Sequence, residues 1–347
     1  MDFQLKQRGR ASMHFLADLA VAAARFKPRV DADIAARGLS EATLADDLDE
    51  RLRQVDAALA DSSAAAAFAV LTEYSGVNHG RIAAEAFDEI RPELEPRLRA
   101  LMNGPTTIEP MPGEARPAYA DAAWIHRTSG GWDGHDYQGF VHGELIHREY
   151  VARTYPGDIF KQRRQILSVL SRRDPARIFE IGSSSGHYTL QLAAEFPKAE
   201  IWGCDPSPRM LEQAQRVANE RGFAWRLFVG SGEATGLPAE SVDLVTSYIV
   251  LHEIPAAAAR AQLREAFRLL RPGGELLFTD VTRYAVLDKR AVRWAEYNAV
   301  HGGEPFWREA ASLELGAAAR EAGFAEVRSE GLGGAPYPWF VYGRKPA

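Results

Sequence analysis

A turn rich in small residues is the part of the sequence whose residue types most clearly favour ligand binding. It follows an apolar run that ends near Glu180, and it places small residues at Gly182, Ser184 and Gly186 before a helical pattern begins. Because these residues have little or no side chain, a ligand can approach the backbone between a strand and the next helix. Ser184 stands where a dinucleotide site has its middle glycine. The turn therefore predicts a different nucleoside ligand.

A carboxylate at the end of the next apolar run is suited to bind the sugar of such a ligand. Asp205 lies at the edge where open α/β sheets bind their ligands. A carboxylate there can accept hydrogen bonds from both ribose hydroxyl groups. The alternative is that Asp205 caps the helix that begins at Ser207 and Pro208, and it stays open at this point.

A histidine that follows the run 242–248 is the leading candidate for a catalytic base. His252 is expected at the carboxyl edge of the sheet, close to a ligand in the turn. Histidine is the side chain whose unperturbed pKa suits proton transfer near neutral pH. Glu253 beside it is a weaker candidate, and a purely structural hydrogen-bonding role of His252 stays open.

The sequence His142-x-Glu144-x-x-His147 has the residue types of a metal site but not the spacing of one. In the metalloprotease pattern H-E-x-x-H the two histidines lie one helical turn apart, and here they do not. The sequence therefore predicts no metal.

The second half of the chain alternates short apolar runs with amphipathic helical segments. This alternation predicts an α/β fold with a mostly parallel sheet that is covered by helices on both faces. Two further extended segments close the chain, at 325–329 and 339–344, with a connection of hairpin length between them, so the end of the sheet is expected to be antiparallel. The other expected strands are 177–181, 200–204, 225–229, 242–248 and 275–279.

The first half reads as a set of helices, interrupted at Pro28, Gly38 and a turn at 76–80. The Pro- and Gly-rich segment 103–117 is the expected linker. A stretch rich in Trp, His, Gly and Tyr follows at 119–155, and Asp158 is expected to begin the next helix with a basic, solvated face at Lys161, Arg163 and Arg164. Residues 1–157 are thus expected to form a helical accessory domain, and 158–347 the ligand-binding domain.

Aromatic residues gather in two places that could enclose a substrate. The segment 284–307, between the strand 275–279 and the next helix, is expected to be a lid or a substrate wall, with a core or dimer contact as the alternative. Its aromatic and histidine residues are Tyr284, Trp294, Tyr297, His301, Phe306 and Trp307; those of the first half are Trp124, Trp132, Tyr137 and Phe140.

Taken in order, the motifs of the second half resemble the class I S-adenosylmethionine-dependent methyltransferases, and within them the small-molecule branch that includes the quinone C-methylating enzymes. The resemblance covers roughly residues 158–344. The motifs are Glu180-x-Gly182-x-Ser184-x-Gly186, Asp205-x-Ser207, Gly232-Glu233-Ala234 with Leu237-Pro238, Leu251-His252-Glu253 and Leu270-Arg271-Pro272-Gly273-Gly274.

The resemblance implies a Rossmann-like, seven-stranded, mostly parallel sheet with an antiparallel end strand, and S-adenosyl-L-methionine as the cofactor. It also assigns the cofactor-binding residues. Glu180, Gly182, Ser184 and Gly186 would surround the methionine end, and Asp205 would bind the ribose. Glu233 or the adjacent Ala234 would lie near the adenine amine. Family members usually have Gly at the position of Ser184 and often Asp at that of Glu233.

The expected reaction is methyl transfer to an oxygen or carbon nucleophile of a small, largely apolar or aromatic molecule. Alignment of the nucleophile with the activated methyl group is the protein's main task in such a reaction. Two alternatives stay open, an enzyme of the same fold that uses the bound cofactor without consuming it, for a rearrangement or cyclisation, and a non-catalytic binding protein.

Composition and net charge limit the classes of binding partner that we expect. A net charge of −6 over 347 residues gives no attraction for nucleic acid, and no apolar stretch is long enough to span a membrane. The single cysteine, Cys204, lies in an apolar run and is expected to be buried and inert. We therefore expect a cytoplasmic protein, with a homodimer as an open possibility.

Overall fold

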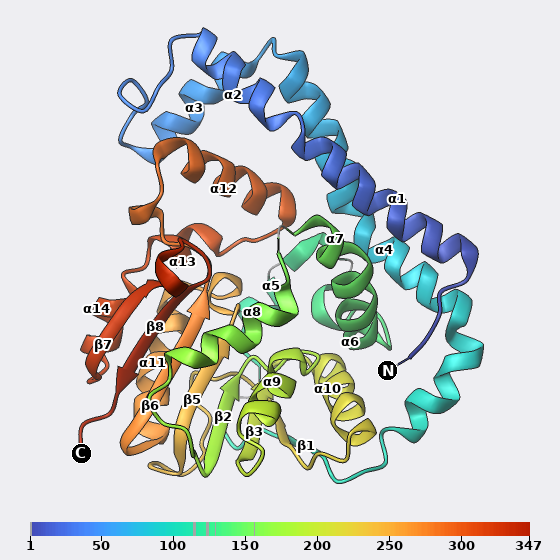
Figure 1. Ribbon diagram of the computed structural model, residues 1–347, viewed down its shortest axis with the longest axis vertical. Coiled ribbons are helices and arrows are strands. Elements are labelled where there is room, and N and C mark those ends of the chain that lie inside the picture. Colours follow the sequence, from blue (N-terminus) through green and yellow to red (C-terminus); the bar gives the residue numbers. More distant parts are fainter. Residues whose placement is uncertain (1, 114–115, 123–124, 129, 156) are drawn as a thin grey trace.

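The computed structural model describes residues 2–113, 116–122, 125–128, 130–155 and 157–347. A sheet flanked by helices forms the lower part of the molecule in Figure 1, and long N-terminal helices extend over it. The expected α/β fold with a helical N-terminal region is confirmed. Trp124, one of the aromatic residues singled out above, lies outside the described residues.

The described strands form one eight-stranded sheet in the order β1-β4-β3-β2-β5-β6-β8-β7. Strands β1 to β6 run parallel to one another, and β8 runs antiparallel to both β6 and β7, as expected. The strands are β1 (Thr107–Pro110), β2 (Arg177–Ile181), β3 (Glu200–Asp205), β4 (Arg226–Val229), β5 (Val242–Tyr248), β6 (Leu270–Asp280), β7 (Ala325–Gly331) and β8 (Trp339–Arg344).

Strand β1 corrects the expected sheet of seven strands and the expected linker at 103–117. Thr107 to Pro110 pair in parallel with Arg226 to Val229, so this segment adds an eighth strand at the edge of the sheet. Pro110 can end an edge strand because nothing outside it needs its missing N–H group. The Pro- and Gly-rich composition concealed a short strand.

Helices cover both faces of the sheet because successive residues of each strand point to opposite sides. Ile178 packs with the helices α9 (His187–Glu195) and α10 (Pro208–Glu220), whereas its neighbour Phe179 packs with α11 (Ala256–Leu269) and α14 (Leu315–Glu321). The remaining helices after β6 are η6 (Tyr284–Val286), α12 (Lys289–Gly302), α13 (Trp307–Ser312) and η7 (Leu332–Gly334), and η5 (Leu251–Glu253) follows β5.

The first half contains two long antiparallel helices and several short ones. Helix α1 (Gln7–Ala24) packs along α4 (Ser63–Ala100), with α2 (Lys27–Ala36) and α3 (Leu48–Leu59) at one end (Figure 1). The short elements that follow are α5 (Tyr119–Ala122), η1 (Ile125–Arg127), η2 (Gly131–Asp133), α6 (Gln138–Phe140), η3 (Val141–Val151), α7 (Ala152–Thr154), α8 (Ile159–Gln165) and η4 (Ile166–Val169). Asp158 caps α8 through the backbone N–H groups of Phe160 and Lys161, as expected.

The expected turn at 76–80 is wrong, because α4 continues through it. Both glycines of that segment permit close contacts instead. A Cβ atom on Gly76 would lie 3.0 Å from the carbonyl oxygen of His301, and one on Gly80 would lie 3.0 Å from Oγ1 of Thr128. The glycines therefore let α4 pack closely against the last turn of α12 and against Thr128, which follows η1.

No single helix of the described residues is long and apolar enough to cross a membrane, whereas α3 and α4, taken together as a bent pair, meet the requirements of length and composition.

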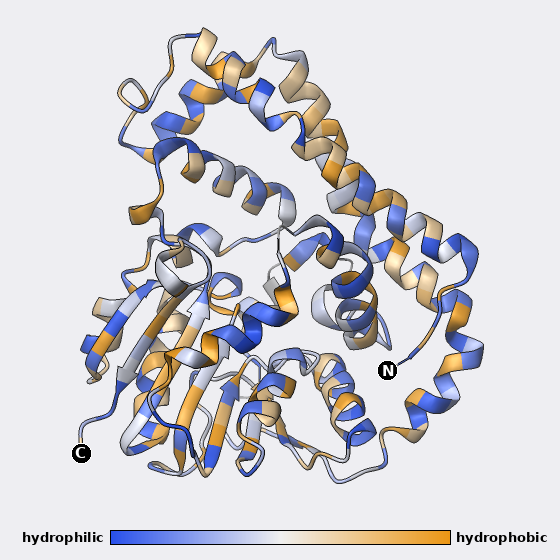
Figure 2. Ribbon diagram, viewed as in Figure 1, coloured by the Kyte–Doolittle hydropathy of each residue, from blue (hydrophilic) through white to orange (hydrophobic). Residues whose placement is uncertain are grey.

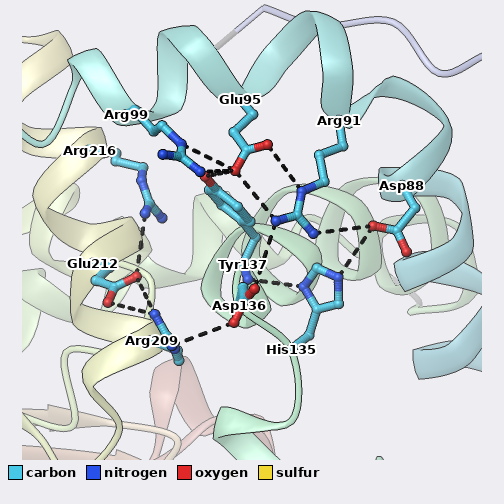
Figure 3. Close-up of polar contacts among 10 residues, drawn as sticks. All are labelled: Asp88, Arg91, Glu95, Arg99, His135, Asp136, Tyr137, Arg209, Glu212 and Arg216. Carbon is cyan, nitrogen blue, oxygen red and sulfur yellow. Dashed lines mark hydrogen bonds and ion pairs between the residues drawn. The ribbon is translucent and has the colours of Figure 1, made fainter.

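Tyr137 connects the long helix α4 to α10 of the α/β half (Figure 3). Its hydroxyl group donates a hydrogen bond to Glu95 over 2.9 Å, and Glu95 also accepts hydrogen bonds from Arg91 and Arg99. The Tyr137 ring lies between two guanidinium groups, 5.3 Å from that of Arg91 and 5.0 Å from that of Arg216. The side chain is buried, at 6% exposure. One residue thus combines apolar burial, a charge-assisted hydrogen bond and cation–π contacts.

We predict that Tyr137→Ala lowers the free energy of unfolding by about 3–5 kcal/mol, because a buried aromatic ring is lost. Tyr137→Phe keeps the ring and removes only the hydrogen bond to the charged Glu95, so it should cost less, about 1.5–3 kcal/mol. Denaturant titration followed by circular dichroism measures both, with Val286→Ala, at an exposed position, as the control. Equal losses in the two Tyr137 variants would contradict the importance assigned to the ring.

Candidate active site

A cavity of about 460 Å³ lies between the carboxyl edge of the sheet and the helical first half. Its walls come from the loops after β2, β3, β4 and β5, from η3 and α4, and from the segment 298–307. Chain segments from both halves of the sequence therefore enclose one space. The cavity is where the expected site residues can be compared with the structure.

The turn after β2 forms one wall of the cavity. Gly182 has a φ of +76°, and a Cβ atom there would lie 2.4 Å from Cγ2 of Val250, so no other residue fits. Gly186 precedes α9 with a φ of +84°. Ser184 also has a positive φ, +46°, which is uncommon for a residue with a side chain. Glycine would adopt this conformation more easily, which agrees with its usual presence in the resembling family.

Asp205 stabilises this turn through hydrogen bonds to the backbone. One of its carboxylate oxygens accepts the backbone N–H of Ser184 at 3.0 Å, and the other accepts that of Ser207 at 2.9 Å. Ser207, not Asp205, caps α10. Burial raises the pKa of Asp205 to about 7. Each oxygen keeps acceptor capacity toward the cavity that Asp205 lines.

Glu180 and Arg163 are an acidic and a basic side chain that both line the cavity. Glu180 is 1% exposed and accepts a hydrogen bond from Thr189, and burial raises its pKa to about 8. Arg163 lines the same cavity, with its guanidinium group over the rings of Phe160 and Tyr248. It makes no ion pair with any described residue. The solvated face expected for Arg163 is therefore wrong, because α8 turns this side chain into the cavity.

The two expected adenine contacts lie beside the cavity rather than in its wall. Glu233 is half-buried and accepts a hydrogen bond from Tyr119, and Tyr119 itself lines the cavity. Ala234 is exposed and does not line it. The neighbouring Ser231 and Gly232 do.

His252 lines the cavity at the carboxyl end of β5 and is held by Asp280. Its Nδ1 lies 3.0 Å from Oδ1 of Asp280, and both side chains are buried. Burial alone would lower the pKa of His252, but the charge of Asp280 and the hydrogen bond to it outweigh this effect and raise the pKa to about 9. His252 is therefore an imidazolium at neutral pH, which the sequence did not predict.

Three further side chains, Glu253, His126 and Glu304, form a cluster with His252 in which acidic and basic groups alternate. His126, from η1, lies 3.0 Å from Glu304 through Nδ1 and 3.4 Å from Glu253 through Nε2. The Nε2 atom of His252 lies 3.9 Å from both Glu253 and Glu304. Burial lowers and the two glutamates raise the pKa of His126, with a net rise well above its ordinary value. Glu253 thus lies near His252 as expected, while His126 and Glu304 were not identified from the sequence.

Helix η3 is a π-helix and supplies the wall that packs against the turn. In a π-helix the hydrogen bonds join residues five apart, so His142 and His147 face the same side. Their ring centroids are 4.5 Å apart, and both line the cavity. Burial lowers the pKa of both well below the ordinary value, so both are neutral at neutral pH. Within the described residues no group of His, Cys, Asp and Glu side chains has the geometry of a metal site.

The aromatic segment 284–307 serves two purposes. Trp294 and Tyr297, on α12, pack into the hydrophobic cluster of the N-terminal helices with Phe68. Trp307 lines the cavity, with its ring centroid 5.2 Å from that of His252. The segment therefore contains both the wall and the core contact that the sequence left as alternatives.

We predict that the ring of His252 titrates near pH 9. Because this folded-state pKa exceeds the unfolded value of about 6.5, its stabilising contribution is full below pH 6.5 and is lost as the pH rises through 9. NMR titration of the histidine rings measures the midpoint. In Asp280→Asn the midpoint should fall, because the charge is gone and burial remains. A wild-type midpoint below pH 7 would contradict the pairing with Asp280.

Comparison with known proteins places this site in a family. Residues 178–274 match a family described as a methyltransferase domain. The chain is 37% identical over 148 residues to a trans-aconitate 2-methyltransferase of Streptomyces avermitilis, which covers 42% of this chain and 49% of that protein. It is 31% identical over 121 residues to a demethylmenaquinone methyltransferase of Thermus thermophilus, with 35% and 54% covered.

The chain thus spans about half the length of the curated relatives it matches. Among solved structures, a phosphoethanolamine N-methyltransferase 2 of Haemonchus contortus in complex with S-adenosyl-L-methionine covers 67% of this chain and 60% of its own, with 18% identity and a TM-score of 0.49. The matched segment, 178–274, begins in β2 and ends in β6, and it includes the turn, Asp205 and His252. Residues 178–274, in the α/β half of this chain, are therefore similar to methyltransferase domains.

Proposed function

We propose that the protein transfers a methyl group from S-adenosylmethionine to an oxygen or carbon nucleophile of a small, largely apolar or aromatic molecule. The observation that carries this proposal is one cavity that joins the turn after β2, the edge with His252 and a wall of rings. The methyltransferase relatives support the same reaction type. Their own substrates are not carried over to this chain.

The residues at the turn have the chemistry that the cofactor requires. Its methionine end carries an ammonium and a carboxylate group, and the buried Glu180 and the cation Arg163 would pair with them. The small residues Gly182, Ser184 and Gly186 would leave room for it, and Asp205 would accept the ribose hydroxyl groups. Glu233 and Ala234 are retained as residues near the adenine, next to Ser231 and Gly232 in the wall. When bound, the cofactor supplies an activated methyl group.

His252 and Glu253 are the catalytic residues that we propose at the reacting edge. As an imidazolium, His252 can donate a hydrogen bond to a substrate, but it accepts a proton only after it has lost its own. His252 can therefore act as a general base only at alkaline pH. Asp280 positions the ring in either state.

We predict that S-adenosylhomocysteine binds to the wild-type protein and that Asp205→Ala weakens binding by about 1.5–3 kcal/mol, because hydrogen bonds to a charged acceptor are lost. Asp205→Asn should weaken it less, since an amide oxygen remains. Calorimetry measures all three proteins, and Asp174→Ala, in an exposed loop, is the control. Absence of binding to the wild type, or equal affinity in all variants, would refute the cofactor assignment.

We propose that residues 1–157 form an accessory domain that helps to enclose the substrate. Gly76 and His79 of α4 and the cavity-facing side of η3 support this role. The net charge of −6 supports a protein without a nucleic-acid partner, and a single buried thiol, Cys204, is compatible with a cytoplasmic location.

The accessory domain is also the proposed site of homodimerisation. Exposed apolar residues follow one side of α4 at Val70, Tyr74 and Val77, with exposures of 68%, 46% and 41%. The N-terminal half of α4, which carries them, is largely hydrophobic in Figure 2. An apolar stripe of this kind favours a protein contact.

We predict a dimer in sedimentation equilibrium that Val70→Glu converts to monomer, because a charge on the stripe would be buried without a partner. Val286→Glu, at another exposed valine, should leave the dimer intact. A monomeric wild-type protein, or dimers of equal strength in both variants, would refute this role of α4.

A further inference from the structure

One carboxylate oxygen of Glu304, which lines the cavity, is buried and accepts no hydrogen bond from a described residue. Its side chain is 11% exposed and lines the cavity. Among the described residues the Oε2 atom is buried and has no hydrogen-bond partner, and Nε2 of His252 lies 3.9 Å from it. The other oxygen, Oε1, lies 3.0 Å from Nδ1 of His126. A buried acceptor without a donor costs free energy, so Oε2 is suited to a donor that a ligand brings.

The backbone at Glu304 is fixed by two hydrogen bonds. Gly303 ends α12 with a φ of +77°, and its carbonyl oxygen accepts the backbone N–H of His126 at 2.9 Å. The backbone N–H of Glu304 donates to the carbonyl oxygen of Ala299 at 2.8 Å. The carboxylate is therefore held in place before a ligand binds, as a group that acts on a substrate must be.

The unpartnered oxygen of Glu304 disfavours an anionic ligand. His126, His252 and Arg283 are the basic groups of the cluster, and Asp280, Glu253 and Glu304 are the acidic groups in contact with them. The cluster as a whole therefore has no excess of negative charge, and the nearest group to a ligand at this point is Oε2 of Glu304. A substrate carboxylate has no hydrogen to donate to this oxygen and would be repelled by it, whereas a neutral O–H group would gain a charge-assisted hydrogen bond.

The neighbouring wall is made of rings. The centroids of His126 and Trp132 are 4.9 Å apart, those of Trp132 and His142 are 4.7 Å apart, and His147 continues the series. These rings present faces and edges to the cavity, and edge-to-face contacts with them favour an aromatic ligand.

We propose that the substrate is a neutral aromatic hydroxyl compound whose O–H group donates a hydrogen bond to Oε2 of Glu304, and that Glu304 accepts its proton during the transfer. This inference rests on the proposed methyl transfer. The step forms an O–CH₃ bond and breaks the S–CH₃ bond, whose electron pair stays on sulfur. The hydroxyl proton moves to Glu304, so the positive charge of the sulfonium and the negative charge of the carboxylate are lost together.

A carboxylate is a sufficient base for this step. While the oxygen gains a methyl group, its proton becomes strongly acidic, so even a carboxylate beside imidazolium groups can accept it late in the reaction. His252 has no free nitrogen lone pair while it is protonated. Glu304 is therefore the acceptor that is available at neutral pH.

Three naphthalene probes of the same ring size test the proposal. 2-Naphthol offers a hydroxyl donor, 2-methoxynaphthalene has no donor, and 2-naphthoate carries a negative charge. Fluorescence titrations with and without saturating S-adenosylhomocysteine give the dissociation constants. The wild-type protein should bind 2-naphthol at least about tenfold more tightly than either of the others, as a hydrogen bond to a charged group implies.

Glu304→Gln should abolish this preference, because the amide has no charge and can donate to a carboxylate. Glu304→Asp keeps the charge next to His126 but withdraws the oxygen, and it should weaken binding of 2-naphthol about tenfold without improving that of 2-naphthoate. Glu309→Gln, on α13 outside the cavity wall, is the matched control and should keep the wild-type order.

Failure of the wild type to bind 2-naphthol, an equal or tighter binding of 2-naphthoate, or an unchanged order in both Glu304 variants would overturn the proposal. Loss of S-adenosylhomocysteine binding is a separate outcome. It would refute the proposed function, while the order of the probes without that ligand would still decide on Glu304.

Discussion

The reacting end of the cavity depends on one buried carboxylate, that of Asp280 at the end of β6. It accepts the backbone N–H groups of Val250 and Leu251 at 2.9 and 2.6 Å, and it pairs with His252 at 3.0 Å. A charge with 0% exposure is stable only when such donors replace the lost water. Ile249, the first residue of this loop, has a φ of +58°, which is a strained conformation for a β-branched residue. Asp280 thus fixes the loop backbone, the ring orientation of His252 and its protonation state at once.

The wider helical turn of the π-helix η3 determines the wall next to the cofactor turn. Its cavity-facing side chains lie at positions 142, 146, 147, 150 and 151, which are four or five residues apart. In an α-helix His142 and His147 would diverge, and the same sequence would present a narrower face to the cavity. Gly143 lies between them, and a Cβ atom there would be 2.5 Å from Oγ of Ser185, so the π-helix packs directly on the cofactor turn. Wall and turn are therefore one packed unit.

The sequence predicted the elements whose signals are local. Buried parallel strands appear as continuous apolar runs, so β2 and β5 were placed with the correct residues. Asp158 and Ser207 indicated where the helices that they cap begin. Gly182 and Gly186 indicated the turn, because only a few backbone conformations require glycine.

The remainder depends on contacts between distant segments, which no local pattern contains. Glycine in α4 looked like a turn because the partner that requires close approach, His301, lies more than two hundred residues away. Arg163 was assigned to a solvated face because helical spacing defines a polar side but not what covers it. The sequence did not identify Glu304 as a site residue, because it shows only that Glu304 lies in an aromatic segment. Its neighbours in the site, His126 and His252, come from two other parts of the chain.

Because of these contacts, the histidines that line the one cavity differ in protonation state. His142 and His147 are neutral because burial acts on them without an acidic partner, whereas His126 and His252 are charged because carboxylates outweigh the same burial. At the turn, burial raises the pKa of Glu180 to about 8 and that of Asp205 to about 7, although the charge of Arg163 lowers the pKa of Glu180, so both carboxyl groups are partly protonated near neutral pH. A ligand with an ammonium and a sulfonium group would favour their ionised forms and release protons on binding. The cavity therefore has an acidic end at the turn, which suits a cationic cofactor, and a wall at η3 whose histidine rings are neutral.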